Sequence, residues 1–236
     1  MVVDQTVTQR PMIIYAMPRS RSLATLVAAQ RLNIYPEPFS FFNLLPDQTE
    51  QLRMLYEHAS RLVPADAWHA LADGLLQSDS ASKIFGYHLH EFRPARDWWH
   101  TAQQVGDVFV LSRDREEICR SYFSAVAFGF KLRDEIAKQP VELPTWQIHH
   151  LDYVIDCHVR YMPSQGRLIT WDNLPPSHFD KQLIDSERKV WLAEPQNGAD
   201  NCRYIQNIDW LMQRAREVLE RHQADWDAKE NALEAA

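Results

Sequence analysis

The chain has 236 residues, of which 45% are hydrophobic and 24% are charged, a composition typical of a soluble globular protein. Its net charge of −7 at neutral pH argues against a general binder of nucleic acid or of anionic membranes. Its three cysteines contain no C-x-x-C pair and indicate neither a disulfide framework nor a zinc site. We therefore expect a single domain over residues 1–236, with no nucleic-acid partner and no membrane partner.

The beginning of the chain does not look like a targeting segment. Residues 1–10 are polar and lack the apolar core of a signal peptide. The sequence also contains no apolar run of about 18 residues, the length that a membrane-spanning helix needs. We expect a cytoplasmic protein whose cysteines are reduced.

A strand, a short loop and a helix are predicted over residues 12–29. A β-prone apolar run leads into a loop with two arginines and two serines, and an alanine- and leucine-rich helix follows. The first N–H groups of a helix lack internal partners and lie at the positive end of its dipole, so they favour phosphate or sulfate. The loop residues that add charge or hydroxyl donors are Arg19, Ser20, Arg21 and Ser22.

Residues absent from this loop restrict its chemistry. Neither glycine nor lysine occurs between Met12 and Ala29, whereas a nucleotide-hydrolysing loop of the form G-x-x-x-x-G-K-[ST] needs both. Magnesium–nucleotide chemistry is therefore poorly supported. The alternative to an anion site is an ordinary surface turn, in which arginines at a helix N-terminus would oppose the helix dipole.

The loop resembles the 5′-phosphosulfate-binding loop of sulfotransferases that use 3′-phosphoadenosine 5′-phosphosulfate (PAPS). In that family a hydrophobic strand is followed by P-[KR]-S-G-[ST], and Pro18, Arg19, Ser20 and Ser22 match this pattern. Arg21 stands where the family has glycine, which tolerates backbone dihedrals that arginine disfavours. The resemblance implies that residues 19–22 bind the phosphosulfate.

Residues 108–123 form a second segment of this kind, with a buried-type strand, an Arg-Asp turn and the start of an amphipathic helix. They resemble the 3′-phosphate-binding segment of the same family, in which an arginine and a serine eight positions later contact the phosphate. Arg113 and Ser121 have this spacing, and the resemblance implies that they bind the 3′-phosphate. The alternative is structural, with Arg113 in a salt bridge and Ser121 packed on a neighbouring helix.

A candidate general base lies between two prolines. Pro36 and Pro38 hold Glu37 in an extended segment after the first helix. This stretch resembles the P-x-E-F-type segment of bacterial-type sulfotransferases, where a glutamate takes the proton of the acceptor. Glu37 matches that position, and the alternative is an exposed loop glutamate.

Two histidines are further candidates for proton transfer. Residues 82–90 are predicted as a strand in which His88 and His90 share one face. The family often has a lysine or a catalytic histidine near the end of the corresponding strand, so His88 or His90 is an alternative base. A structural histidine at a strand end is the favoured reading for both. The other clustered histidines, at 149, 150 and 158, lack partners at ligand spacing, and no metal is expected.

Strands near Met12, Ile84, Val108 and Leu168 alternate with helices, which predicts an α/β fold with a parallel sheet. Ligands of such sheets bind at the carboxyl ends of the strands, where both anion loops lie. The resemblance implies a three-layer α/β/α arrangement with a mainly parallel central sheet, the P-loop NTPase-like sulfotransferase fold. Helical cap regions are expected at about 38–80 and 128–165, and a final helix is expected over about 207–227 with a frayed tail beyond it.

The expected function is that of a PAPS-dependent sulfotransferase. It would move the sulfuryl group to a hydroxyl or amine of a small-molecule or carbohydrate acceptor and release 3′,5′-adenosine bisphosphate (PAP). Arg19 would offset charge on the leaving phosphate, and Glu37 or His88 would take the proton. A divergent P-loop small-molecule kinase and a non-catalytic nucleotide-binding module are the alternatives, and a homodimer is left open.

Overall fold

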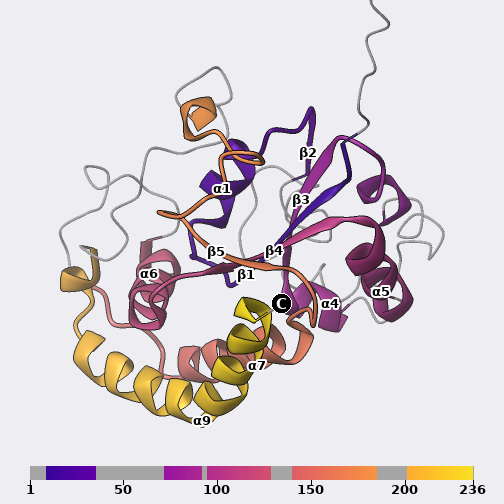
Figure 1. Ribbon diagram of the computed structural model, residues 1–236. Coiled ribbons are helices and arrows are strands. Elements are labelled where there is room, and N and C mark those ends of the chain that lie inside the picture. The colour runs from indigo at the N-terminus through magenta and orange to yellow at the C-terminus, as the bar shows by residue number, and fades with distance from the viewer. Residues whose placement is uncertain (1–8, 36–71, 92–94, 129–139, 185–200, 236) are drawn as a thin grey trace, which may run out of the picture.

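A computed structural model describes residues 9–35, 72–91, 95–128, 140–184 and 201–235. Its centre is a five-stranded sheet in the order β2-β3-β1-β4-β5, in which every pairing is parallel (Figure 1). The expected α/β class with a parallel sheet is confirmed. The strands are β1 (Met12–Ala16), β2 (Asn33–Tyr35), β3 (Ser80–Phe85), β4 (Asp107–Ser112) and β5 (Arg167–Thr170). The short strand β2 was not predicted.

The central strand β1 is buried along its whole length. A continuous apolar run, MIIYA, suits a strand that is covered on both faces. Because side chains alternate along a strand, Ile13 and Tyr15 enter the core on one face, and Met12 and Ile14 enter the core on the other. The two faces therefore need separate helical layers.

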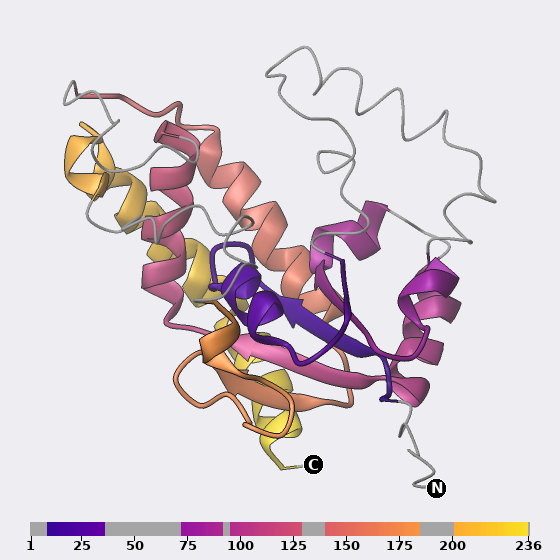
Figure 2. The same ribbon diagram turned by 90° about the horizontal axis from the view of Figure 1, so that it is seen from above.

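Helices cover both faces of the sheet (Figures 1 and 2). Buried residues of α5, α6, α7 and α9 share the larger core, and α1 contributes to the smaller core on the opposite face. None of the helices in the described ranges has the length and apolar character needed to cross a membrane. The helices are α1 (Ser22–Ala28), α4 (Gly86–Glu91), α5 (Ala95–Val105), α6 (Arg115–Phe128), α7 (Gln147–Tyr161) and α9 (Ile208–Glu234), with 3₁₀ turns η2 (Lys181–Ile184) and η4 (Cys202–Tyr204).

The larger core is organised around an aromatic stack. The ring of Tyr15 stacks on His158 of α7 with centroids 5.0 Å apart, and the Tyr15 hydroxyl donates to the carbonyl of His158 over 2.7 Å. The centroid of Trp226 in α9 also lies 5.0 Å from that of His158, with the two rings tilted by 59°. The region 128–165, expected to form a cap, thus includes a helix that packs in the core against β1.

The predicted strand over residues 82–90 is wrong in its second half. Strand β3 ends at Phe85, and α4 begins at Gly86. A Cβ atom at position 86 would overlap the backbone carbonyl of Cys157, so only glycine lets α4 pack this closely on α7. His88 and His90 consequently lie on a helix, and the reasoning that placed them on one face of a strand does not apply.

The predicted end of the last helix is also wrong, because α9 continues to Glu234 instead of fraying after position 227. A contact with the start of α6 accounts for this extension. The guanidinium of Arg115 lies 4.3 Å from the centroid of Trp226 and forms ion pairs with Asp227 at 2.7 Å and with Glu230 at 2.9 Å. These contacts fix the last turns of α9 to the domain.

All three cysteines are buried free thiols on different elements. Burial raises the pKa of the Cys119 thiol in α6 to about 12 and that of Cys202 in η4 to about 11. Cys157 lies in α7 and is fully buried. The thiols of Cys119 and Cys202 are therefore protonated at neutral pH.

Candidate functional site

The two predicted anion loops follow adjacent strands at the same edge of the sheet. Strand β1 pairs with β4 in parallel, with Ala16 opposite Leu111, so the loops that follow these strands start side by side. Arg19 lies three residues after the end of β1, and Arg113 follows directly after β4. This is the carboxyl edge, where open α/β sheets bind their ligands.

Side-chain contacts join the two loops. The Nε of Arg19 donates to the Oγ of Ser121 over 3.1 Å, and the Nη1 of Arg113 donates to the backbone carbonyl of Arg19 over 2.6 Å. Three residues that the sequence assigned to two separate phosphate sites therefore form one cluster. Ser121 is buried and Arg19 is half-buried, so the cluster is partly shielded from water.

The electrostatics of this cluster favour an anion. Burial, together with the positive charge of Arg113, lowers the pKa of Arg19 from its ordinary value. Both effects raise the free energy of the charged guanidinium relative to its value in water. A bound phosphate or sulfate would offset this cost, because it would add opposite charge beside two arginines.

The Nε and Nη2 groups of Arg113 contact Glu117, a residue that the sequence did not predict in the site. The Nε and Nη2 of Arg113 lie 3.0 and 2.9 Å from the Oε2 of Glu117, one helical turn further along the chain. An arginine and a glutamate spaced i,i+4 at the start of a helix are a signal for such a pair. The expected structural alternative for Arg113, a salt bridge, is thus also present.

The backbone of the first loop is unusual for its sequence. Arg19 and Arg21 have positive φ angles of 72° and 65°, the left-handed region that glycine adopts most readily. Arg21 occupies the position where the resembled family has glycine, and it precedes α1. Its carbonyl accepts hydrogen bonds from the N–H and the Oγ1 of Thr25, at 3.0 and 3.1 Å. The loop therefore takes a glycine-like conformation without a glycine.

The serines of this loop are less available than expected. Ser20 and Ser22 are 1% and 4% exposed. The Oγ of Ser20 donates to the carbonyl of Met17 over 2.6 Å, which stabilises the turn itself. For Ser20 to donate its hydroxyl proton to an anion, it would have to give up this hydrogen bond.

His88 also lies near the carboxyl edge, in the helix that follows β3. It is fully buried, its Nδ1 lies 3.4 Å from the N–H of Phe85, and its Nε2 has no hydrogen-bond partner in the described part of the chain. Burial and the positive charge of Lys83 lower its pKa to about 3. The imidazole of His88 is thus neutral at physiological pH. His90 is less buried, and its Nδ1 lies 3.2 Å from the Tyr161 hydroxyl.

Glu37, the other candidate base, lies outside the described residues, as do residues 38–71 of the first expected cap.

No role was predicted for Lys83, although this residue is buried in β3, with only 4% of its surface exposed. Within the ranges that the structure describes, no group of three or more His, Cys, Asp or Glu side chains could hold a metal ion.

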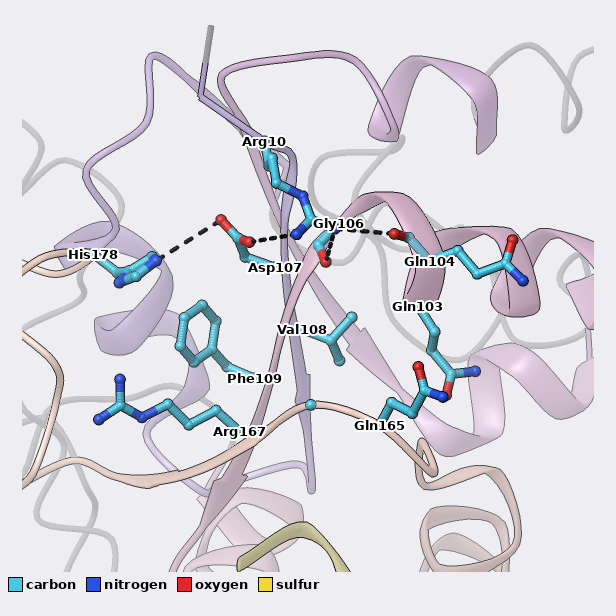
Figure 3. A pocket seen from close by; sticks show the side chains of 11 residues that line it. Arg10, Gln103, Gln104, Gly106, Asp107, Val108, Phe109, Gln165, Arg167 and His178 are labelled. Carbon is cyan, nitrogen blue, oxygen red and sulfur yellow. Dashed lines mark hydrogen bonds and ion pairs between the residues drawn. The ribbon is translucent and has the colours of Figure 1, made fainter. Parts of the chain in front are cut away.

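A separate pocket of about 550 Å³ opens at the opposite edge of the sheet, where β4 and β5 begin (Figure 3). Asp107 at its rim pairs with Arg10 at 3.6 Å, with Arg31 at 3.3 Å and with His178 at 3.8 Å. These contacts fix the segment before β1 and the chain after β5 to the start of β4. We favour the carboxyl edge as the functional site, because the two loops that the sequence predicts to bind anions meet there.

No protein-family model, curated protein or solved structure matches the chain.

Proposed function

We propose that the protein is a PAPS-dependent sulfotransferase that acts on a hydroxyl or amine of a small-molecule or carbohydrate acceptor. The single observation that carries the proposal is the 3.1 Å hydrogen bond from Arg19 to Ser121. It joins a residue of the phosphosulfate-type loop to a residue of the 3′-phosphate-type segment. A nucleotide with phosphate groups at both positions requires these two segments to lie together.

Each arginine has a separate task in this function. Arg113 and Ser121 bind the 3′-phosphate, which distinguishes PAPS from ATP. Arg19, helped by the hydroxyl of Ser22 and the backbone N–H groups of residues 21 and 22, binds the 5′-phosphosulfate, while the Ser20 hydroxyl stabilises the turn. The planar guanidinium donates two parallel N–H groups to one phosphate, a geometry that lysine lacks.

The reaction is an in-line displacement at sulfur. The acceptor oxygen or nitrogen forms a bond to sulfur while the bond from sulfur to the 5′-phosphate oxygen breaks, and PAP leaves. Arg19 offsets the negative charge that develops on the leaving oxygen. Positioning and charge stabilisation supply most of the catalysis, as they do in phosphoryl transfer, and the scheme requires no metal.

The acceptor proton goes to a general base, for which we propose Glu37. A base works best when its pKa lies near the operating pH, and the pKa of about 3 at His88 is far below that range. His88 remains the alternative by its place near the same edge of the sheet, although its Nδ1 accepts from the N–H of Phe85, which leaves the proton of the neutral ring on Nε2. Glu37→Gln and His88→Gln variants distinguish them, because only loss of the base abolishes transfer while PAP binding persists.

The first experiment is a thermal melt with PAP, with 5′-AMP and with ATP plus magnesium. A ligand at about a hundred times its Kd adds roughly 2.7 kcal/mol to the free energy of unfolding. We expect a large shift with PAP that disappears in Arg113→Ala. The matched control is Arg160→Ala, since Arg160 pairs with Asp156 on the same helix and lies outside the cluster. A shift only with ATP plus magnesium would instead support the kinase.

A non-catalytic nucleotide-binding module is the second candidate, and the low pKa of the buried His88, which makes it a weak base, favours it. Binding of PAP by the wild type, without sulfuryl transfer from PAPS to a panel of phenols, alcohols, amines and sugars, would support the module. Transfer to any acceptor in the panel, lost in Arg19→Ala, would support the sulfotransferase.

A further inference from the structure

Arg113 already holds an anionic group, the carboxylate of Glu117, on the edge that a phosphate would use. We infer that Glu117 occupies the place of the 3′-phosphate in the free protein and is displaced when a 3′-phosphorylated nucleotide binds. Glu117 thereby lowers the affinity of the site and makes it selective for strongly charged anions. This inference rests on the proposed function.

The donors of Arg113 are divided between two partners. Its Nε and Nη2 both point to one carboxylate oxygen of Glu117, at 3.0 and 2.9 Å, while its Nη1 donates to the carbonyl of Arg19 at 2.6 Å. The pair of Nε and Nη2 is a fork that fits a carboxylate or a phosphate equally well. Two anions cannot occupy this fork together.

The structure lets Glu117 leave without unfolding the helix. Its side chain is 54% exposed, whereas that of Arg113 is only 19% exposed. The backbone N–H of Glu117 is capped by the Oδ1 of Asp114 at 2.8 Å, so the backbone stays fixed while the carboxylate turns toward water. Arg113 meanwhile remains anchored by the Arg19 carbonyl and keeps its fork in place for the incoming phosphate.

Displacement favours some ligands over others. An exposed i,i+4 ion pair is weak, so a phosphate dianion beside Arg113 and Arg19 outcompetes it. A singly charged group gains less from the two arginines and still has to replace the carboxylate. A ligand that lacks a 3′-phosphate does not bind the Nε and Nη2 of Arg113, so Glu117 does not change the affinity of the site for it.

The test compares the Kd of PAP and of 5′-AMP by calorimetry for the wild type, Glu117→Gln and Glu116→Gln. Glu116 is the matched control, because it carries the same charge on the same turn but pairs with Arg216 at 2.8 Å. Removal of the competing carboxylate in Glu117→Gln is expected to tighten PAP about threefold to tenfold and to change 5′-AMP less than about twofold. Glu116→Gln is expected to change both ligands less than about twofold.

Each outcome decides a separate point. Equal tightening of PAP and 5′-AMP, or equal effects of the two substitutions, would mean a general charge effect and would overturn the inference while leaving the proposed function intact. Weaker PAP binding in Glu117→Gln would show that Glu117 supports the site instead of competing for it. If neither the wild type nor Glu117→Gln binds PAP, the proposed function fails and the inference fails with it.

Discussion

The guanidinium of Arg19 and the hydroxyl of Ser121 are 102 residues apart in the chain and 3.1 Å apart in space. The parallel pairing of β1 with β4 brings them together, since it places the ends of both strands at one edge. Their contact makes the cluster a single unit, and a change at one residue is therefore expected to affect ligand binding through the other.

Ser121→Ala is expected to weaken PAP binding about tenfold, or ~1.4 kcal/mol, because Arg19 loses a hydrogen-bond acceptor and the phosphate loses a donor. Titration calorimetry measures the change. Ser124, which is also buried in α6 but forms no part of the cluster, gives the matched control Ser124→Ala. Equal losses in both variants would indicate a packing effect of α6 and would contradict the assignment of Ser121.

Arg21→Gly is expected to stabilise the protein by about 1 kcal/mol, because the left-handed φ of 65° costs an arginine more than a glycine. Urea denaturation measures the change in the free energy of unfolding. Arg21→Ala separates backbone strain from side-chain charge, since alanine keeps the strain and removes the charge. If alanine stabilises the protein as much as glycine does, the strain is not the cause.

Acid is expected to destabilise the fold through His158. Burial lowers its folded-state pKa to about 3 from the ordinary 6.5. Between these values the unfolded chain binds a proton that the folded chain does not, so the free energy of unfolding falls by ~1.4 kcal/mol for each pH unit below 6.5. The stabilisation is complete above 6.5 and is lost toward 3. The buried His88 adds a similar dependence.

Denaturation at pH 6.5 and at pH 5 tests this dependence. His158→Phe keeps an aromatic ring beside Tyr15 and Trp226, and its free energy of unfolding is expected to fall by about 2 kcal/mol less than that of the wild type over this interval. His149 is exposed on the same helix, and His149→Gln is expected to keep the wild-type dependence. An unchanged pH dependence in His158→Phe would mean that the buried ring is protonated in the folded state.

Arg115→Ala is expected to lower the free energy of unfolding by about 1–2 kcal/mol, since it removes a contact with Trp226 and two ion pairs at once. Hydrogen exchange should rise most in the last turns of α9. The control is Arg214→Ala, because the exposed Arg214 pairs with Glu217 at 2.7 Å and lies 5.7 Å from the centroid of Trp210, both within its own helix. Comparable losses in the two variants would show that the junction of α6 and α9 contributes no more than a surface pair.

The apolar runs of β1 and β4 were predictable because central parallel strands are apolar along their whole length. Strand β2 was missed because it has only three residues and carries no such run. The end of β3 depended on Gly86 and its close approach to Cys157, a tertiary contact that the local alternation of His88 and His90 concealed.

The meeting of Arg19 with Arg113 was predictable from strand order, since parallel strands share one carboxyl edge. The role of Glu117 was harder to foresee. Its i,i+4 spacing allows a pair with Arg113 but does not show that the pair lies beside Arg19. The inward hydroxyl of Ser20 likewise depends on the turn that Arg19 and Arg21 make with positive φ.

The three buried thiols give the wild-type protein its own set of kinetic probes. Cys119, Cys157 and Cys202 lie on α6, α7 and η4, and a thiol reagent reaches each of them only when the surrounding structure opens. Labelling rates followed by mass spectrometry would therefore report how often each of these three elements opens, without any engineered cysteine. The same labelling in the presence of PAP would show whether nucleotide binding slows the opening of α6 alone or that of α7 and η4 as well.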